Sequence, residues 1–164
     1  MNKSAIQAVA TFNDASIKGY VLFTENEKDK CTDIHAYLHG LPPNCEIGWH
    51  IHVTGDLRKK GYMSCGAHYN PKNKTHGGPH SSIRHIGDLG NLITDKNGNS
   101  NSTLKLKSIK LKGKYSIIGR SLICHGGKDD FGKGGVPESK TTGNSGSRIG
   151  SAVIGYSEDS KLYF

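Results

Sequence analysis

The feature that most constrains the fold is a series of short segments in which apolar and polar residues alternate. A period of two places every second side chain on the same face of a β-strand. Helical periodicity is hard to find, and turn signals such as DKNG at 95–98 separate the segments. The alternating segments lie at 5–12, 17–24, 32–40, 46–53, 91–94, 102–111, 116–125 and 151–157. These eight predicted strands indicate an all-β chain folded as an antiparallel sandwich or barrel.

The length of the chain favours a single domain. Its 164 residues are enough to build one hydrophobic core, and we find neither an internal repeat nor a linker. We therefore expect one domain over residues 1–164. Two long glycine-rich segments interrupt the alternation at about 54–87 and 126–149. Loops of this length are usually functional or disordered, and the many histidines of the first favour function.

The chain is strongly basic, with 22 Lys and Arg against 14 Asp and Glu and a formal net charge of +8. This balance favours binding of a polyanion such as nucleic acid, or electrostatic attraction of a small anion. A solvated basic surface without such a role is the plain alternative. The lysines are scattered, as in RKK at 58–60, with no recognition helix or interleaved aromatic residues. We therefore expect no nucleic-acid partner.

Targeting signals are absent from the sequence. No apolar run approaches the roughly 18 residues that a membrane-spanning helix needs. The N-terminal MNKSAIQAVATF lacks the long apolar segment and cleavage site of a secretory signal peptide. We expect a cytoplasmic protein with no membrane partner. The four cysteines contain no CxxC pair, which in a cytosolic chain favours free thiols.

Histidine is the strongest chemical signal, and two of the nine histidines lie in the segment GWHIHVTGD at 48–56. In a strand His50 and His52 point to one face, while Trp49 and Ile51 point to the other. Two imidazoles placed in this way can chelate one metal ion, although exposed strands also produce such pairs. We expect Trp49 to serve in packing.

The first long loop adds further ligand-type residues. Within residues 67–91 it supplies His68, His76, His80, His85 and Asp88. Three imidazoles and a carboxylate suit zinc in a tetrahedral site, and a merely histidine-rich polar loop is the alternative. His125 ends the segment 116–125, either as a residue of the rim or as a further ligand from another part of the sheet.

The blocks that contain these histidines resemble the copper/zinc superoxide dismutase family, cytosolic type. They follow the family's order at nearly its spacings: HIHVTGD (50–56), AHYNP (67–71), HGGP (76–79), RHIGDLGN (84–91), IIGR (117–120), DDFGKGG (129–135) and TGNSGSR (142–148). The resemblance covers essentially the whole chain. It implies an eight-stranded Greek-key β-barrel, or immunoglobulin-like sandwich, with two long functional loops, assembled as a homodimer.

The resemblance also implies one copper and one zinc in each subunit. Copper would be held by His50, His52, His68 and His125. Zinc would be held by His68, His76, His85 and Asp88. His68 would therefore be shared by both metals, and Asp129 would link a copper-ligand histidine to a zinc-ligand histidine. His35, His39 and His80 fall outside this set and are expected on the surface.

The implied activity is that of an oxidoreductase that converts superoxide to dioxygen and hydrogen peroxide. Copper would alternate between two oxidation states, while zinc would fix the geometry of the loop. His68 and Arg148 would be the catalytic residues. The bond from copper to His68 would open on reduction, and Arg148 would dock the anion in a channel narrowed by Thr142. The alternative is a copper/zinc-binding module with little turnover, and the complete ligand set favours the enzyme.

The sequence departs from the family at its usual disulfide. Counted from His68 and Arg148, the resemblance places the two cysteines at Tyr62 and Ser151. We therefore expect this disulfide to be absent and maturation to need no thiol oxidation or copper-delivery protein. Another pairing remains open among Cys31, Cys45, Cys65 and Cys124.

Two further segments differ from the family. In the loop at 136–142, Pro137 precedes Glu138 and Lys140 lies one place early, which puts the usual steering of the anion in doubt. The C-terminal segment 156–164 runs past the usual end, where it either covers the dimer interface or frays.

Overall fold

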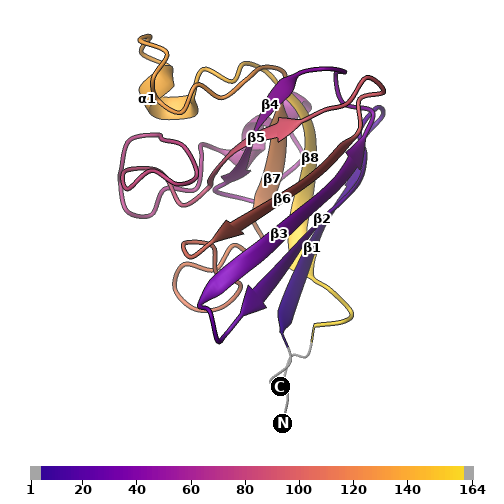
Figure 1. Ribbon diagram of the computed structural model, residues 1–164, viewed down its shortest axis with the longest axis vertical. Coiled ribbons are helices and arrows are strands. Elements are labelled where there is room, and N and C mark those ends of the chain that lie inside the picture. The colour runs from indigo at the N-terminus through magenta and orange to yellow at the C-terminus, as the bar shows by residue number, and fades with distance from the viewer. Residues whose placement is uncertain (1–4, 161–164) are drawn as a thin grey trace.

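A computed structural model describes residues 5–160, which are folded almost entirely as β-strands (Figure 1). The strands are β1 (Ile6–Asn13), β2 (Lys18–Asn26), β3 (Cys31–His39), β4 (Glu46–His52), β5 (Asp88–Ile93), β6 (Ser100–Leu106), β7 (Ser121–His125) and β8 (Arg148–Tyr156). A 3-10 helix, η1 (Lys60–Cys65), and a short α-helix, α1 (Ser139–Thr142), lie in the two long loops. Within the described part of the chain, neither helix has the length and apolar character needed to cross a membrane.

The eight strands form one antiparallel sheet in the order β5-β4-β7-β8-β1-β2-β3-β6. β6 pairs with β3 and β4 pairs with β7, so two connections cross between distant strands, as in a Greek key. The sheet curves until its edge strands β5 and β6 approach each other, which nearly closes a barrel (Figure 1). This confirms the predicted all-β, eight-stranded class.

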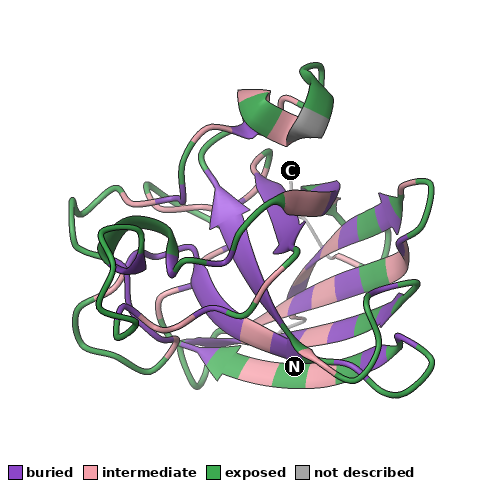
Figure 2. Cartoon of the chain, turned by 90° about the horizontal axis from the view of Figure 1, so that it is seen from above, coloured by how far each residue is buried: buried purple, intermediate pink, exposed green. Residues whose placement is uncertain are grey.

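Alternating side chains of the strands fill the barrel. In β1, Ile6, Ala8, Ala10 and Phe12 are buried, while the residues that alternate with them are partly or fully exposed. Burial of a large apolar side chain such as Phe12 contributes about 1.5–3 kcal/mol. In contrast, β4 is buried from Ile47 to His52 and β7 over its whole length. Figure 2 shows this difference, with alternating colours on some strands and continuous purple on others near the loops.

Two strands are shorter than the alternating segments from which they were predicted. The segment 102–111 leaves the sheet after Leu106, and only Ser121–His125 of 116–125 is strand. Between them the chain folds over, with Ile117 N donating to Lys110 O at 2.9 Å. The buried Ile109 and Ile117 of this connection join the core. An irregular segment can thus bury every second side chain as a strand does, which is why the prediction was wrong here.

Two other strands begin earlier than predicted, because polar residues also find partners in the sheet. β5 begins at Asp88, which lies opposite His50 of β4. β8 begins at Arg148, which lies opposite His125 of β7. Both added residues are candidate site residues, so the strand pairing itself places Asp88 beside His50 and Arg148 beside His125.

All four cysteines are free, and Tyr62 and Ser151 occupy the two positions at which the resemblance places the family's disulfide. The start of the C-terminal segment lies along β1, because Ser157 N donates to Gln7 O at 3.1 Å and Gln7 N donates to Ser160 Oγ at 3.1 Å. The remainder of the segment, 161–164, lies outside the described residues.

Candidate metal centre

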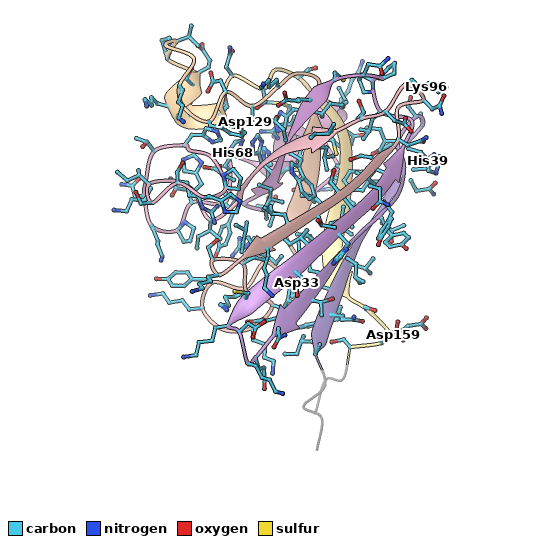
Figure 3. The ribbon with its side chains drawn as sticks, in the orientation of Figure 1. Asp33, His39, His68, Lys96, Asp129 and Asp159 are labelled. Carbon is cyan, nitrogen blue, oxygen red and sulfur yellow. The ribbon has the colours of Figure 1, made fainter. Side chains whose placement is uncertain are left out.

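Two groups of buried ligand-type side chains meet where the first long loop lies against the barrel. Their candidate ligand atoms lie within 4.8 Å of one another in each group. One group consists of His50, His52, His68 and His125. The other includes His50, His68, His76 and Asp88. Figure 3 shows His68 and Asp129 close together beside the long loops, far from His39.

Strands β4 and β7 position three histidines of the first group. His50 and His52 share one face of β4 and lie opposite Ile123 and Ser121 of β7. Trp49, which lies between His50 and Gly48 on β4, is packed inside the hydrophobic core as predicted. His125 follows a register shift at the end of β7, and such bulges redirect a side chain. His68 comes from the loop and joins the strand through an isolated bridge to His52.

The first group holds four buried ring nitrogens that have no hydrogen-bond partner among the described residues. They are His50 Nδ1, His52 Nε2, His68 Nε2 and His125 Nε2. In three of these rings the other nitrogen is hydrogen-bonded. His50 Nε2 lies 2.8 Å from Asp129 Oδ2, His52 Nδ1 lies 2.9 Å from Gly66 O, and His125 Nδ1 lies 3.2 Å from Gly146 O. Such bonds orient imidazoles that bind metals. Unpaired buried polar atoms are costly, and one copper ion would satisfy all four because imidazole suits copper.

The second group surrounds one carboxylate oxygen. His68 Nδ1, His76 Nδ1 and His85 Nδ1 lie 3.0, 3.0 and 3.1 Å from Asp88 Oδ1. The other oxygen of Asp88 accepts hydrogen bonds from Gly77 N at 3.1 Å and His85 N at 2.8 Å, which fixes the loop around it. Three imidazoles and a carboxylate form a donor set that fits zinc.

Asp129 joins the two groups. Its Oδ2 lies 2.8 Å from His50 Nε2 and its Oδ1 lies 2.8 Å from His76 Nε2. Asn91 holds Asp129 in place, because Asp129 N donates to Asn91 Oδ1 at 2.8 Å and Asn91 Nδ2 donates to Asp129 O at 3.0 Å. Asn91 was not among the predicted site residues, and its place in the block RHIGDLGN was the only signal for it.

Burial keeps the imidazoles of the first group in the neutral form that binds metals. It lowers the pKa of His52 to about 2 and that of His125 to about 4. The pKa of His50 is also well below its ordinary value, first because of burial and then because of His68 and His125. Burial likewise lowers the pKa of His68. Metal ligands bind as neutral imidazoles, so protons compete weakly here.

In the second group, hydrogen bonds between carboxylates and imidazoles shift the pKa values in favour of the charged forms. Burial lowers the pKa of His76, but its hydrogen bonds to Asp129 and Asp88 raise it to about 9. Burial raises the pKa of Asp88, but its hydrogen bonds to His68, His76 and His85 hold it well below the ordinary value. Asp88 is therefore ionised, which is the form that ligates a cation.

A cleft of about 540 Å³ opens beside the first group, and Thr142 and Arg148, the two predicted channel residues, line it. Its lining includes His52, Met63, His68, His125, Thr142 and Arg148. The guanidinium of Arg148 donates from Nη1 to Tyr62 O and from Nη2 to Gly66 O, each at 2.6 Å. Burial lowers the pKa of Arg148, although arginine remains charged in proteins. A fixed positive charge in a concave cleft attracts small anions.

The remaining histidines lie outside both groups. His39 and His80 are exposed, and His35 is half-buried on β3. The structure therefore brings together all seven predicted ligands and separates them from the histidines expected on the surface.

The sequence is similar to a known protein family over most of its length. The family model described as copper/zinc superoxide dismutase (SODC) matches residues 17–154. The Cu-Zn superoxide dismutase of Paramecium bursaria Chlorella virus 1 is 47% identical over 154 residues, covering 94% of this chain and 80% of the relative. The Cu-Zn superoxide dismutase of Saccharomyces cerevisiae is 44% identical over 151 residues, covering 92% and 97%.

A solved structure extends the likeness to the fold. The crystal structure of the clock protein EA4 matches this chain with a TM-score of 0.87 at 39% sequence identity, covering 94% of this chain and 97% of the other. The family model and the relatives span most of the sequence, including all of the candidate ligands. The chain therefore belongs to the copper/zinc superoxide dismutase family.

Proposed function

We propose that this chain converts superoxide to dioxygen and hydrogen peroxide, with copper in the four-histidine group and zinc in the group around Asp88. The observation that carries this proposal is the set of four buried, unpaired ring nitrogens beside a carboxylate surrounded by three imidazoles. Bound copper supplies one-electron chemistry between two oxidation states, and bound zinc stiffens the loop.

His68 is the residue that serves both sites. His50 also lies near both groups, but its Nε2 is held by Asp129, which leaves only Nδ1 for a metal. His68 instead directs Nδ1 toward Asp88, and its Nε2 has no partner among the described residues. Copper is thus assigned to His50, His52, His68 and His125, and zinc to His68, His76, His85 and Asp88. Because His68 borders the cleft, its Nε2 can also hold a proton next to the bound anion.

Arg148 and Thr142 form the anion site. Two carbonyl oxygens fix the guanidinium of Arg148, which leaves its charge facing the cleft beside His68 and His125. The site binds superoxide through this charge, orients it toward the copper group and excludes larger molecules with Thr142. Asp129 supports the activity by orienting His50 and His76.

We also infer that residues 1–164 form a single domain and that the protein is a cytoplasmic homodimer that loads copper without a dedicated delivery protein. The IIGR and VTGD blocks resemble the family's dimer contacts, and two exposed valines nearby, Val53 and Val153, support an apolar interface. Four free thiols fit a reducing compartment. Light scattering of the purified protein tests the dimer.

Metal analysis combined with a superoxide-decay assay tests the proposed function. The protein loaded with copper and zinc should bind one of each and consume superoxide rapidly. His125→Ala should lose copper and turnover but keep zinc, because His125 belongs to the copper group alone. His39→Ala, which changes an exposed histidine, is the matched control and should keep both metals and full activity. A fully metallated protein that is inert toward superoxide would refute the proposal.

A further inference from the structure

Asp14 follows β1, yet its carboxylate contacts two segments far along the chain. The Tyr62 hydroxyl donates to Asp14 Oδ1 at 2.5 Å, and Ser151 N donates to Asp14 Oδ2 at 2.8 Å. Tyr62 belongs to η1 in the first long loop, and Ser151 belongs to β8. One half-buried carboxylate therefore ties the turn after β1 to the loop and to the strand that carries Arg148.

The backbone conformation of Tyr62 indicates that its hydrogen bonds hold it in place. Its φ is 58°, a left-handed conformation that bulky residues adopt only when their surroundings impose it. Asp14 holds its hydroxyl, and Arg148 holds its carbonyl oxygen at 2.6 Å. Burial, and then the hydrogen bond to Asp14, raise the pKa of Tyr62 to about 12, so the hydroxyl remains a donor at physiological pH.

The turn that carries Asp14 is also packed tightly against β8. A Cβ added at Gly150 would lie 2.6 Å from Ile17 Cδ1 and 3.1 Å from Asp14 Oδ2. A strand residue without a side chain often marks such a close approach of two backbones. The position of Asp14 relative to β8 is therefore fixed by packing as well as by its hydrogen bond to Ser151.

The surroundings of Arg148 come from both of the segments that Asp14 joins. The guanidinium extends from β8, while the two carbonyl oxygens that fix it belong to Tyr62 and Gly66 of the loop. All four cysteines are free, so no disulfide holds the loop against β8. A shift of the loop away from β8 would move both acceptors and leave the guanidinium without its orientation.

We propose that Asp14 is a positioning residue for the anion site, because it clamps Tyr62 to β8 and so fixes the carbonyl oxygens that orient Arg148. This inference rests on the proposed function only in taking Arg148 as the anion-binding residue. The clamp joins the two positions, Tyr62 and Ser151, at which the family resemblance places a disulfide. Hydrogen bonds to a carboxylate are among the strong ones, and they form without an oxidant.

Azide binding and hydrogen exchange test the clamp in the protein loaded with copper and zinc. The absorption of the bound copper measures azide binding. In Asp14→Ala and Tyr62→Phe, we expect the affinity for azide to fall about five- to tenfold, which corresponds to ~1–1.4 kcal/mol. Amides of the loop segment 57–66 should exchange faster, while metal content stays unchanged. The same chemical changes on β3, Asp33→Ala and Tyr37→Phe, are matched controls and should alter neither property.

A rescue experiment separates positioning from a general loss of stability. Tyr62→Cys with Ser151→Cys, added to Asp14→Ala, should restore azide affinity and loop protection when oxidised but not when reduced. If Asp14→Ala does not fold, Tyr62→Phe decides alone. Azide affinity within about twofold of the wild type in the variants that fold, with unchanged loop exchange, would overturn the inference. Failure of the proposed function would appear differently, as a metallated wild-type protein that does not consume superoxide.

Discussion

His50 and His76 are hydrogen-bonded to opposite oxygens of the same carboxylate. Asp129 Oδ2 lies 2.8 Å from His50 Nε2, and Asp129 Oδ1 lies 2.8 Å from His76 Nε2. Because we assign His50 to copper and His76 to zinc, the two proposed sites share this support in addition to His68. A substitution of Asp129 should therefore change the affinity for both metals.

Replacing Asp129 with Asn should weaken both metal sites. The amide cannot accept a hydrogen bond on both sides, so His50 and His76 lose their fixed orientation, and we expect the affinity for each metal to fall by about 10–100-fold. Competition with chelators measures both dissociation constants. Asp33→Asn removes a half-exposed carboxylate that pairs with Lys105 and should leave both constants unchanged. A loss confined to one metal would contradict the shared support.

Reversing the charge of Arg148 should slow turnover without removing metal. In Arg148→Glu the cleft repels the anion, and we expect the second-order rate to fall by at least about tenfold. Stopped-flow measurement of superoxide decay, with metal analysis of the same sample, checks this. Arg58→Glu makes the same charge change on a side chain that is 90% exposed, and it should have a much smaller effect. An unchanged rate in Arg148→Glu would show that Arg148 does not dock the anion.

The stability of the metal-free protein should be greatest near pH 6.5. Burial lowers the pKa of His125 to about 4, so below pH 6.5 the unfolded state binds more protons and stability falls as the pH approaches 4. Hydrogen bonds to Asp129 and Asp88 outweigh burial and raise the pKa of His76 to about 9. The stability that this shift contributes is complete below pH 6.5 and is lost as the pH rises through 9.

Urea unfolding of the metal-free protein between pH 4 and pH 9 measures this profile. The acid side should span a few kcal/mol, and His125→Gln should make it shallower because one buried titrating group is removed. His80→Gln changes an exposed histidine and should leave the profile as it is. A free energy of unfolding that rises steadily from pH 6.5 to pH 4 would contradict the direction of the His125 shift.

Activity should not depend on thiol oxidation. All four cysteines are free, so iodoacetamide should label all four in the denatured protein without a reducing agent, as mass spectrometry would show. Prior treatment with a reducing agent should change neither the turnover of the metallated enzyme nor its thermal midpoint. Two protected thiols in the untreated sample would show that a disulfide forms after all.

Most of the strands were predictable from the sequence for a physical reason, and the candidate ligands that the structure brings together were named from the family resemblance. The alternation of β1 and β3 survives because each has one face in the core, which a period of two records directly. The candidate ligands were recognisable from the family resemblance, which the two-residue spacing of His50 and His52 on a strand supports. His68, His76 and His85 follow in one loop, whereas Asp88 begins β5 and His125 ends β7.

The contacts between distant segments could not be foreseen. Asp14 reads as one acidic residue in a turn, and it lies 48 residues from Tyr62 and 137 residues from Ser151 in the sequence. The pairing of β8 with β1 and the packing of η1 against β8 bring these three together. The same limit applies to the segment that contains Ile109 and Ile117. Its alternating apolar residues do not show whether its backbone is hydrogen-bonded within a sheet.

We propose that one imidazole, that of His68, serves both metal sites. Electron paramagnetic resonance of the protein with Cu(II) in both groups tests it most directly, because two Cu(II) ions joined by one imidazolate couple magnetically. We expect most of the signal of isolated Cu(II) to disappear, whereas the copper/zinc form should give one full signal. Two independent Cu(II) signals at full intensity in the wild-type protein would contradict the claim.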